Sequence, residues 1–394
     1  MKPSFRALPL GGPDRLTTVW FEGDRERLQV ATSVVGIGID LTGPQDRVTA
    51  SHEQLVALAA SLDGLGSRHG ASLRNYLEPV TAWQTRTRTF PLDRPIIVGI
   101  LNLTEDSFSG DGVGQDIQSA LRRAEALRTA GSDIIDTGAE SARADRPVMD
   151  ESAEADLAAG TIAALVREGH AVSIDTYKPV VARAAIEAGA EIVNDISGLT
   201  LGTGAAAAAS NAGAGYILNY SYSVPKRRPD SPPLYADVMA DHVGWFEQRL
   251  SELAAAGLPR GHTAIDPGIA FGKSHDEDIQ VIRRLAELQT FGLPVMLAHS
   301  RKNFIGSING QPPAERDLET HMASAVAYAR GVRLFRVHDP AGARRALEMA
   351  AAIESAPPGA FAPDATSWPW RAGASAAHMT REAPSAAPPP GQRW

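Results

Sequence analysis

The stretch Val172–Asp195, which reads VSIDTYKPVVARAAIEAGAEIVND, decides the fold. It begins and ends with short apolar runs, Val172–Asp175 and Ile192–Asp195, of the kind that form strands buried on both faces of a parallel sheet. A helical stretch, Pro179–Ala188, lies between them, and the following Gly189 stands where a helix C-cap is expected. The stretch therefore predicts one strand–helix–strand unit with parallel strands.

The same alternation continues in both directions, from about residue 95 to about residue 355. Eight strands that are each followed by a helix predict an α/β fold, the closed (β/α)8 or TIM barrel. An open doubly wound sheet is the structural alternative. The other strand-like runs are Ile96–Leu101, Asp133–Asp136, Gly215–Asn219, Thr263–Asp266, Val295–Ala298 and Leu334–Val337, and further examples of the helical stretches are Ile117–Ala130, Glu151–Glu168, Ala236–Ala256, Asp276–Phe291, Glu315–Arg330 and Ala341–Ile353.

Residues 1–93 precede this alternation and predict a small α/β appendage of unknown role. Leu16–Phe21 and Ser33–Ile39 are strand-like, and Thr85–Thr89 alternates Thr with Arg as an exposed strand does. A helix is expected after Ser51, a suitable N-cap. Its apolar face comprises Leu55, Leu58, Ala59 and Leu62.

Residues 94–355 are then the barrel, and residues 356–394 are rich in Ala, Pro, Ser and Gly. Such a composition buries little apolar surface, so we expect a flexible tail.

The composition places the chain among ordinary globular proteins. Of its 394 residues 43% are hydrophobic and 21% charged, with a formal net charge of −8 and no cysteine. The negative charge gives no reason to expect binding to nucleic acid or to an anionic membrane. No apolar run is long enough to span a bilayer, and the first residues lack the apolar core of a signal peptide. We expect a cytoplasmic protein.

Polar residues stand at the ends of the predicted strands, where a buried strand would normally end in apolar residues or Gly. In a barrel all these ends face one mouth, which is where active sites lie. Asp175 alone could instead be the N-cap of the following helix. The strand-end residues are Asn102, Asp136, the loop Glu140–Arg143, Asp175, Asn194, Asp195, Asn219, Asp266, Ser300, Arg301, Lys302, Arg336 and His338.

One group of these residues, Asp175, Asn194, Asp266 and Lys302, offers two carboxylates, an amide and an ammonium group. Carboxylates and amides at fixed spacing suit a flat heterocycle whose edge carries adjacent donors and acceptors. A structural salt bridge between Asp266 and Lys302 is the alternative.

A second group, Asn102, Ser300, Arg336 and His338, suits a phosphate or diphosphate. Barrels often bind phosphate near strands seven and eight, and Arg engages phosphate oxygens with two hydrogen bonds. Asn102 is a plausible Mg²⁺ ligand, because Mg²⁺ takes few protein ligands and keeps phosphate or water oxygens. The alternative for His338 is a structural histidine.

The motifs in this order resemble those of the dihydropteroate synthase family over about residues 95–355. They are Gly99-Ile-Leu-Asn-Leu-Thr-Glu-Asp-Ser-Phe-Ser, Ser173-Ile-Asp-Thr-Tyr-Lys-Pro, Asn194-Asp-Ile-Ser-Gly, Asp266-Pro-Gly-Ile-Ala-Phe-Gly-Lys, Ser300-Arg-Lys-Asn-Phe-Ile-Gly and Arg336-Val-His-Asp. The resemblance implies a transferase of folate biosynthesis that joins 6-hydroxymethyl-7,8-dihydropterin diphosphate to 4-aminobenzoate and releases diphosphate.

The resemblance also implies roles for single residues. Asp175, Lys302 and Arg143 form the catalytic set, and the pterin is held by Asp175, Asn194, Asp266, Lys302 and Phe271. Asn102, Ser300, Arg336 and His338 bind the diphosphate, with Asn102 as the ligand of Mg²⁺, while Ser300 and Phe271 also lie near the aminobenzoate. Barrels of this kind often pair through outer helices, so a homodimer is expected.

The sequence departs from the family pattern mainly in its second loop. Where the family reads Gly-Gly-Glu-Ser-Thr-Arg-Pro-Gly, this chain has Gly138-Ala-Glu-Ser-Ala-Arg-Ala-Asp, so that Ala142 and Ala144 replace Thr and Pro. Asn219-Tyr220 replaces a His-Met segment whose Met packs on the pterin. These changes leave open a non-catalytic pterin-binding paralogue or an enzyme with another acceptor. A corrinoid-dependent methyltransferase is a third reading, against which the diphosphate-binding motifs argue.

Overall fold

The computed structural model describes residues 4–8, 16–43, 45–103, 112, 114, 116–140, 148–222, 233 and 235–355. Its largest sheet has parallel strands in the order β12-β11-β10-β9-β8-β7-β14-β13, and a parallel bridge between Ile265 and Val295 joins the two ends of this order. The predicted closed barrel is confirmed and the open sheet excluded. The strands are β7 (Ile96–Asn102), β8 (Ile134–Gly138), β9 (Val172–Asp175), β10 (Ile192–Asp195), β11 (Gly215–Asn219), β12 (Thr263–Asp266), β13 (Met296–Leu297) and β14 (Leu334–Val337).

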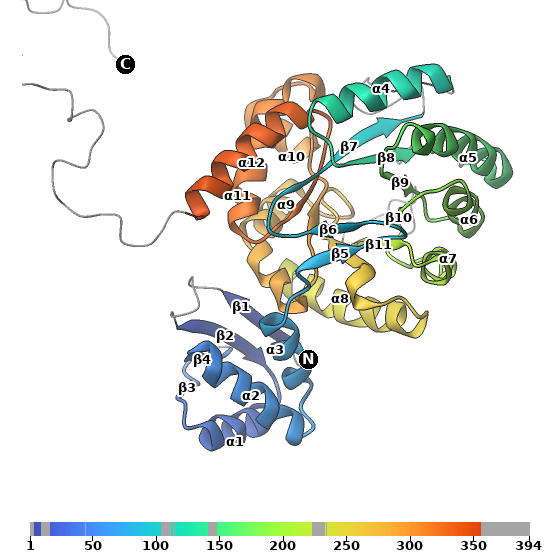
Figure 1. Cartoon of the computed structure of the whole chain (residues 1–394). Coiled ribbons are helices and arrows are strands. Elements are labelled where there is room, and N and C mark those ends of the chain that lie inside the picture. The colour runs from blue at the N-terminus through green and yellow to red at the C-terminus, as the bar shows by residue number, and fades with distance from the viewer. Residues whose placement is uncertain are drawn as a thin grey trace, which may run out of the picture. The chain divides into compact units, whose positions relative to one another are not determined.

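Helices surround the barrel strands (Figure 1). The helix predicted over residues 276–291 is two elements, because the backbone leaves the helical region at Arg284. The helix expected after the fourth strand, whose bounds were not predicted, is α7, whereas α10 is an additional short helix that was not predicted. The barrel helices are α4 (Ile117–Thr129), α5 (Glu151–Arg167), α6 (Pro179–Glu187), α7 (Gly204–Ala212), α8 (Val238–Ala255), α9 (His275–Arg283), α10 (Asn303–Asn309), α11 (Asp317–Ala329) and α12 (Pro340–Glu354), with short 3₁₀ helices η1 (Arg260–His262), η2 (Leu285–Phe291) and η3 (Pro313–Glu315).

The interior of the barrel changes from apolar to polar along the strands. An inner apolar cluster takes one residue from most strands. Because side chains on the same face of a strand recur every second residue, the residue two positions further on also points inward. That next layer is mostly polar and lies toward the carboxyl ends. The apolar cluster includes Val98, Ile134, Ala171, Ile192, Ile217, Ala264, Met296 and Leu334, and the layer above it comprises Ile100, Asp136, Ser173, Asn194, Asn219, Asp266, Ala298 and Arg336.

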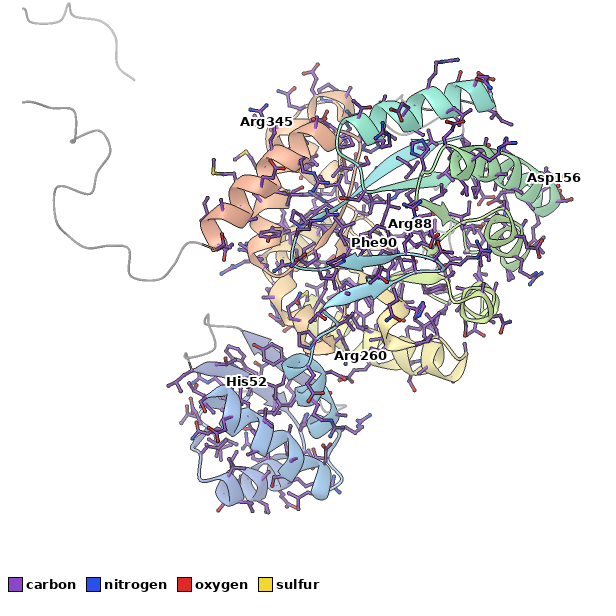
Figure 2. All side chains as sticks on the ribbon, in the orientation of Figure 1. His52, Arg88, Phe90, Asp156, Arg260 and Arg345 are labelled. Atoms are coloured by element: carbon purple, nitrogen blue, oxygen red, sulfur yellow. The ribbon has the colours of Figure 1, made fainter. Side chains whose placement is uncertain are left out.

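A hairpin of β5 (Ala82–Gln84) and β6 (Thr89–Pro91) closes the opposite end of the barrel. Figure 1 labels its two strands, and Figure 2 labels Phe90 on β6. Trp83 is fully buried against the inner apolar cluster and donates its indole N–H to the carbonyl of His262 over 3.0 Å. The expectation of an exposed strand over Thr85–Thr89 is wrong, because residues 85–88 form the turn between β5 and β6. Thr85 is also buried, and its hydroxyl bonds the carboxylate of Glu191. The division of the chain at residue 93 stays a prediction, and these contacts lead us to propose that the barrel unit begins near residue 82.

The residues before the hairpin form a sheet in the order β1-β2-β4-β3 with three helices and their own apolar core. The predicted cap is confirmed, since Ser51 and Gln54 form a reciprocal capping box. The prediction of a strand over Ser33–Ile39 is wrong: helix α1 continues to Val35 and ends at Gly36, whose φ of 75° stops it. These elements are β1 (Ser4–Leu8), β2 (Thr17–Glu22), α1 (Arg25–Val35), β3 (Ile39–Asp40), β4 (Asp46–Ala50), α2 (His52–Gly64) and α3 (Arg68–Leu77).

None of the helices in the described part of the chain is long and apolar enough to cross a membrane. The prediction of a flexible tail falls on residues 356–394, which lie outside the described residues.

Candidate functional site

The guanidinium of Arg336, at the end of β14, is bound by two carboxylates inside the barrel. Its Nε donates to Asp136 Oδ2 over 2.6 Å, and its Nη2 donates to Asp175 Oδ2 over 3.0 Å. Burial lowers the pKa of Arg336, but the two carboxylates together raise it above its usual value, so the side chain is a permanent cation. The polar layer therefore contains an ordered cluster of two carboxyl groups around one guanidinium cation.

The carboxyl group of Asp175 is strongly perturbed by its surroundings. Burial raises its pKa to about 7, against the opposing effect of Arg336 and with the support of Asp136. The alternative of a helix cap is wrong, because α6 has its N-cap at Lys178 and the Asp175 carboxylate binds Arg336 instead. A carboxyl group with such a pKa can either donate or accept a hydrogen bond near neutral pH.

Asn194 and Asp136 share a hydrogen bond and leave further polar atoms unsatisfied. Asn194 Nδ2 donates to Asp136 Oδ2 over 3.3 Å. Asn194 Oδ1, Asp136 Oδ1 and Ser173 Oγ are buried without a hydrogen-bond partner among the described residues. Since a buried unpaired polar atom costs about 1–3 kcal/mol, these atoms favour a ligand that supplies the missing hydrogen bonds.

Asp266 is fully buried and its carboxylate is held by backbone amides. Oδ1 accepts from Gly268 N over 2.7 Å and Oδ2 accepts from Ala298 N over 3.1 Å. Burial raises its pKa, while the charge of Lys302 opposes the rise. The hydrogen bonds of Asp266 therefore go to the backbone, which does not support the alternative of a structural salt bridge with Lys302.

Lys302 follows β13 and reaches toward the loop between β12 and α9. Its Nζ donates to the carbonyl of Ile269 over 2.6 Å and lies 5.0 Å from the centre of the Phe271 ring. Burial lowers its pKa to about 8, although Asp266 and Asp278 favour the charged form. The structure thus brings Lys302, Phe271 and Asp266 together around one loop.

Ser300 and His338 form a second polar pair. His338 Nδ1 lies 2.9 Å from Ser300 Oγ, which also accepts from the backbone N–H of His338 over 3.2 Å. Asn102 is half-buried at the end of β7, on the face that carries Ile100 inward. The predicted diphosphate group is therefore divided: Ser300 pairs with His338, whereas the guanidinium of Arg336 bonds Asp136 and Asp175.

Several strand-end residues do not face the barrel interior. Asp195 directly follows the inward-facing Asn194, so its side chain points to the other face of the strand. Its carboxylate accepts hydrogen bonds from Tyr216 Oη over 2.6 Å and from Ser197 N over 2.7 Å. Arg301 makes a paired contact with Asp317, both distances being 2.7 Å. These two residues are structural. Arg143, Ala142 and Ala144 lie outside the described residues.

Sequence reasoning missed two residues of the site. Asp136 was noted at a strand end but was not assigned a role. Its position two residues after Ile134, which faces inward, could have indicated that its side chain also faces the interior of the barrel. Lys273 closes the run that starts at Asp266, and its Nζ donates to the carbonyls of Gly268, Pro267 and Phe271 over 2.6, 3.3 and 3.3 Å. Only the three-dimensional path of this loop reveals those contacts.

The described residues contain no group of three or more His, Asp or Glu side chains that could hold a metal ion by themselves. Asn102 supplies one amide oxygen at the mouth. This donor set fits a Mg²⁺ ion only if most of its ligands come from a bound diphosphate and water.

A family model described as pterin binding enzyme matches residues 98–338. The closed barrel and its polar layer, matched by that model, define a pterin-binding barrel. The dihydropteroate synthase of Neisseria meningitidis serogroup C is 34% identical over 270 residues, which are 68% of this chain and 95% of that protein. The Escherichia coli K12 enzyme is 32% identical over 67% of this chain and 94% of its own length. The chain therefore belongs to the dihydropteroate synthase family of pterin binding enzymes.

Solved structures agree with this assignment. The Yersinia pestis dihydropteroate synthase with a sulfonamide drug complex superposes with a TM-score of 0.66 at 33% identity, covering 70% of this chain and 100% of that one. The Thermus thermophilus enzyme in complex with 4-aminobenzoate gives a TM-score of 0.62 at 33% identity, covering 69% of this chain and 99% of that one.

Proposed function

We propose that the inward polar layer binds the pterin ring of 6-hydroxymethyl-7,8-dihydropterin diphosphate. The chain is a dihydropteroate synthase-like transferase that condenses this substrate with 4-aminobenzoate and releases diphosphate, a step of folate biosynthesis. The observation that carries the proposal is the set of unsatisfied inward atoms on Asp136, Asn194 and Ser173, beside the charged groups of Asp175 and Arg336. Such atoms match the alternating donors and acceptors on the edge of a pterin.

Within this site Asp175, Asn194 and Asp266 hydrogen-bond the pterin, and Lys302 and Phe271 border it. Asp266 is preorganised by two backbone amides, so its carboxylate needs no reorganisation when a ligand arrives. Lys302 provides a cation close to this carboxylate. The assignment of these roles is supported by the proximity of Lys302 to Phe271 and to the Asp266 loop.

The diphosphate end is assigned to Asn102, Ser300, Arg336 and His338. The paired Ser300 and His338 offer a hydroxyl and an imidazole at the strand ends next to Arg336. Asn102 would hold Mg²⁺ together with the diphosphate oxygens, and the metal, when bound, supplies positive charge that stabilises the leaving group. Arg336 contributes to both the pterin end and the diphosphate end of the site. Its two carboxylate partners, Asp136 and Asp175, hold it beside the pterin.

In the reaction the C–O bond between the pterin methylene and the diphosphate breaks, and the electron pair leaves with the diphosphate. The amine of 4-aminobenzoate donates its lone pair to the methylene carbon and then loses a proton to water. Asp175 in its ionised form stabilises the positive charge that develops on the pterin, while Arg336 and His338 stabilise the departing anion. Arg143 completes the proposed catalytic set on the second loop, and Lys302 holds the pterin in place.

A diphosphate-release assay with the pterin diphosphate, Mg²⁺ and 4-aminobenzoate tests this function. We expect release that depends on all three components. Tight pterin binding without release, with any arylamine, would support the non-catalytic paralogue instead. Release with another amine but not with 4-aminobenzoate would favour a different acceptor.

The second loop provides a matched variant for the same assay. Ala142→Thr restores the residue that the family resemblance associates with aminobenzoate contact. We expect it to lower the KM for 4-aminobenzoate without changing the affinity for pterin. An unchanged KM would argue against a role of position 142 in arylamine recognition.

We also propose that the chain forms a homodimer in the cytoplasm through its outer helices. Helix α11 exposes Leu318, Met322 and Val326 at every fourth position, and α12 exposes Met349 and Ile353. Such an apolar stripe favours burial against a second copy. Sedimentation of the protein and of a Met322→Glu variant tests this: the variant is expected to be monomeric.

A further inference from the structure

Tyr220, the residue that follows β11, has a fully buried ring with contacts on several sides. Its hydroxyl donates to Asp241 Oδ2 over 2.8 Å and lies 3.1 Å from the hydroxyl of Tyr235. The ring is stacked on His242, with 3.8 Å between centroids and an interplanar angle of 12°. Burial raises the pKa of Tyr220, so the phenol stays neutral. Tyr220 is thus a rigid aromatic platform, with its hydroxyl directed toward α8.

The ammonium group of Lys273 lies over this platform, 4.5 Å from the ring centroid. The same Nζ bonds the three carbonyls of Pro267, Gly268 and Phe271, so the side chain folds back into its own loop. A partly desolvated ammonium over an aromatic ring gains about 1–2 kcal/mol. Lys273 therefore ties residues 267–271 to the end of β11.

Two further features restrict the conformation of the loop. Ala270 has a φ of +68°, and its N–H donates to both carboxylate oxygens of Asp278, over 3.0 and 3.1 Å. Gly268 has a φ of +64°, and a Cβ there would lie 2.0 Å from the carbonyl oxygen of Tyr220. The loop conformation is therefore unusual and is held from both sides.

The opposite side of the loop faces the proposed substrate site. Ile269 accepts from Lys302 Nζ, and Phe271 lies beside the same ammonium group. A displacement of the loop would thus move Phe271 and remove a hydrogen bond from Lys302.

We propose that Lys273, held on the ring of Tyr220, is a positioning residue that sets the β12–α9 loop and thereby the places of Phe271 and Lys302 in the substrate site. The proposal rests on the proposed function and deepens it. It also gives a role to a departure in this sequence: at the position where the resemblance implies Met, Tyr220 offers an aromatic face to an ammonium group.

Charged groups from several elements surround the two lysines. Burial lowers the pKa of Lys273 to about 8, and Lys302 nearby acts in the same direction. Removal of the Lys273 charge is therefore expected to raise the pKa of Lys302, and loss of loop contacts that bury Lys302 acts in the same sense. The charged groups that act on Lys302 are Asp266, Asp278, Arg336, Asp175 and Lys273, and those that act on Lys273 are Asp278, Lys302, Asp266 and Glu277.

The test compares Lys273→Met and Tyr220→Leu with Arg283→Met, which removes an exposed cation from α9. For the first two variants we expect the KM for 4-aminobenzoate to rise about tenfold, the factor that corresponds to loss of the cation–π contact. We expect a smaller change in kcat, and no change for Arg283→Met. Tyr220→Phe, which keeps the ring, should retain more of the wild-type KM than Tyr220→Leu. Circular dichroism and thermal denaturation establish whether each variant is folded.

Calorimetric titration of pterin across pH gives a readout that does not need turnover. The alkaline loss of pterin affinity should move to higher pH in Lys273→Met, because the pKa of Lys302 rises. A folded Lys273→Met protein with wild-type KM and an unmoved alkaline loss would overturn the proposal. If the wild-type protein binds pterin but releases no diphosphate, the proposed function fails, while the shift in the titration still tests the positioning role.

Discussion

Arg336 and Asp136 form the shortest link across the polar layer, with Nε and Oδ2 separated by 2.6 Å. Asp136 is fully buried, and its other oxygen has no partner among the described residues. The pair therefore both orients the guanidinium and presents an acceptor to the interior of the barrel. This double role makes Asp136 the most informative residue that sequence reasoning left without a role.

Asp136→Asn should lower pterin affinity by at least about tenfold and destabilise the protein, because breaking a buried ion pair costs about 3–5 kcal/mol. Asp195→Asn is the matched control, since its buried carboxylate bonds Tyr216 and Ser197 and not the cluster. The control should lose thermal stability but keep its pterin affinity. Calorimetry and thermal denaturation of both variants check this. Equal affinities for wild type and Asp136→Asn would contradict the assignment.

Asp175→Asn should abolish turnover, because the variant cannot stabilise positive charge on the pterin. The pKa of Asp175 is raised to about 7, so between its ordinary value and about 7 the folded protein holds a proton that the unfolded chain has lost. The contribution of Asp175 to stability therefore falls as pH rises through this window. Denaturant titrations at several pH values should show a flatter profile for Asp175→Asn. Activity near the wild-type level would exclude a catalytic role.

Because of Lys302, we expect alkaline pH to lower the affinity for pterin and to raise the stability of the fold. Its pKa is lowered to about 8, so above that value the site loses a cation and pterin affinity should fall. Between about 8 and the ordinary lysine pKa the unfolded chain binds a proton that the folded protein lacks, so stability should rise with pH. Lys302→Arg keeps the charge and should remove the alkaline loss of affinity. The same loss in Lys302→Arg would assign it to another group.

Much of the barrel was predictable because the two patterns that define it, apolar strands and the helices between them, are local in the sequence. Short apolar runs and intervening helices are visible within a few residues, and inward-facing Asp175, Asn194 and Asp266 follow from strand-end position. The pairing of Arg336 with Asp136 joins residues 200 positions apart, and no spacing in the sequence indicates it. The polar residues at the strand ends also included both inward-facing and outward-facing side chains, as Asn194 and Asp195 illustrate, so strand-end position alone did not identify the residues of the site.

The failed strand over Ser33–Ile39 has a different cause. Its β-branched residues favour a strand, but Leu28, Ala31 and Thr32 form a buried helical face that continues α1 to Val35. Val34 remains 73% exposed, so local preference for a strand was overcome by packing elsewhere on the helix.

Substitution of Trp83 is expected to change the stability of the barrel without changing its affinity for pterin. Its ring fills the end of the barrel opposite the polar layer, and its N–H bonds the carbonyl of His262. Trp83→Ala should therefore reduce the free energy of unfolding by about 3–5 kcal/mol, the usual cost of removing a buried aromatic side chain. Trp83→Phe, which keeps most of the volume, should cost less. Pterin affinity, measured where both variants are folded, should remain at the wild-type value, because Trp83 takes no part in the hydrogen bonds that the described residues of the site make. A fall in affinity that matches the loss of stability would instead show that the hairpin and the polar layer are coupled through the apolar cluster between them.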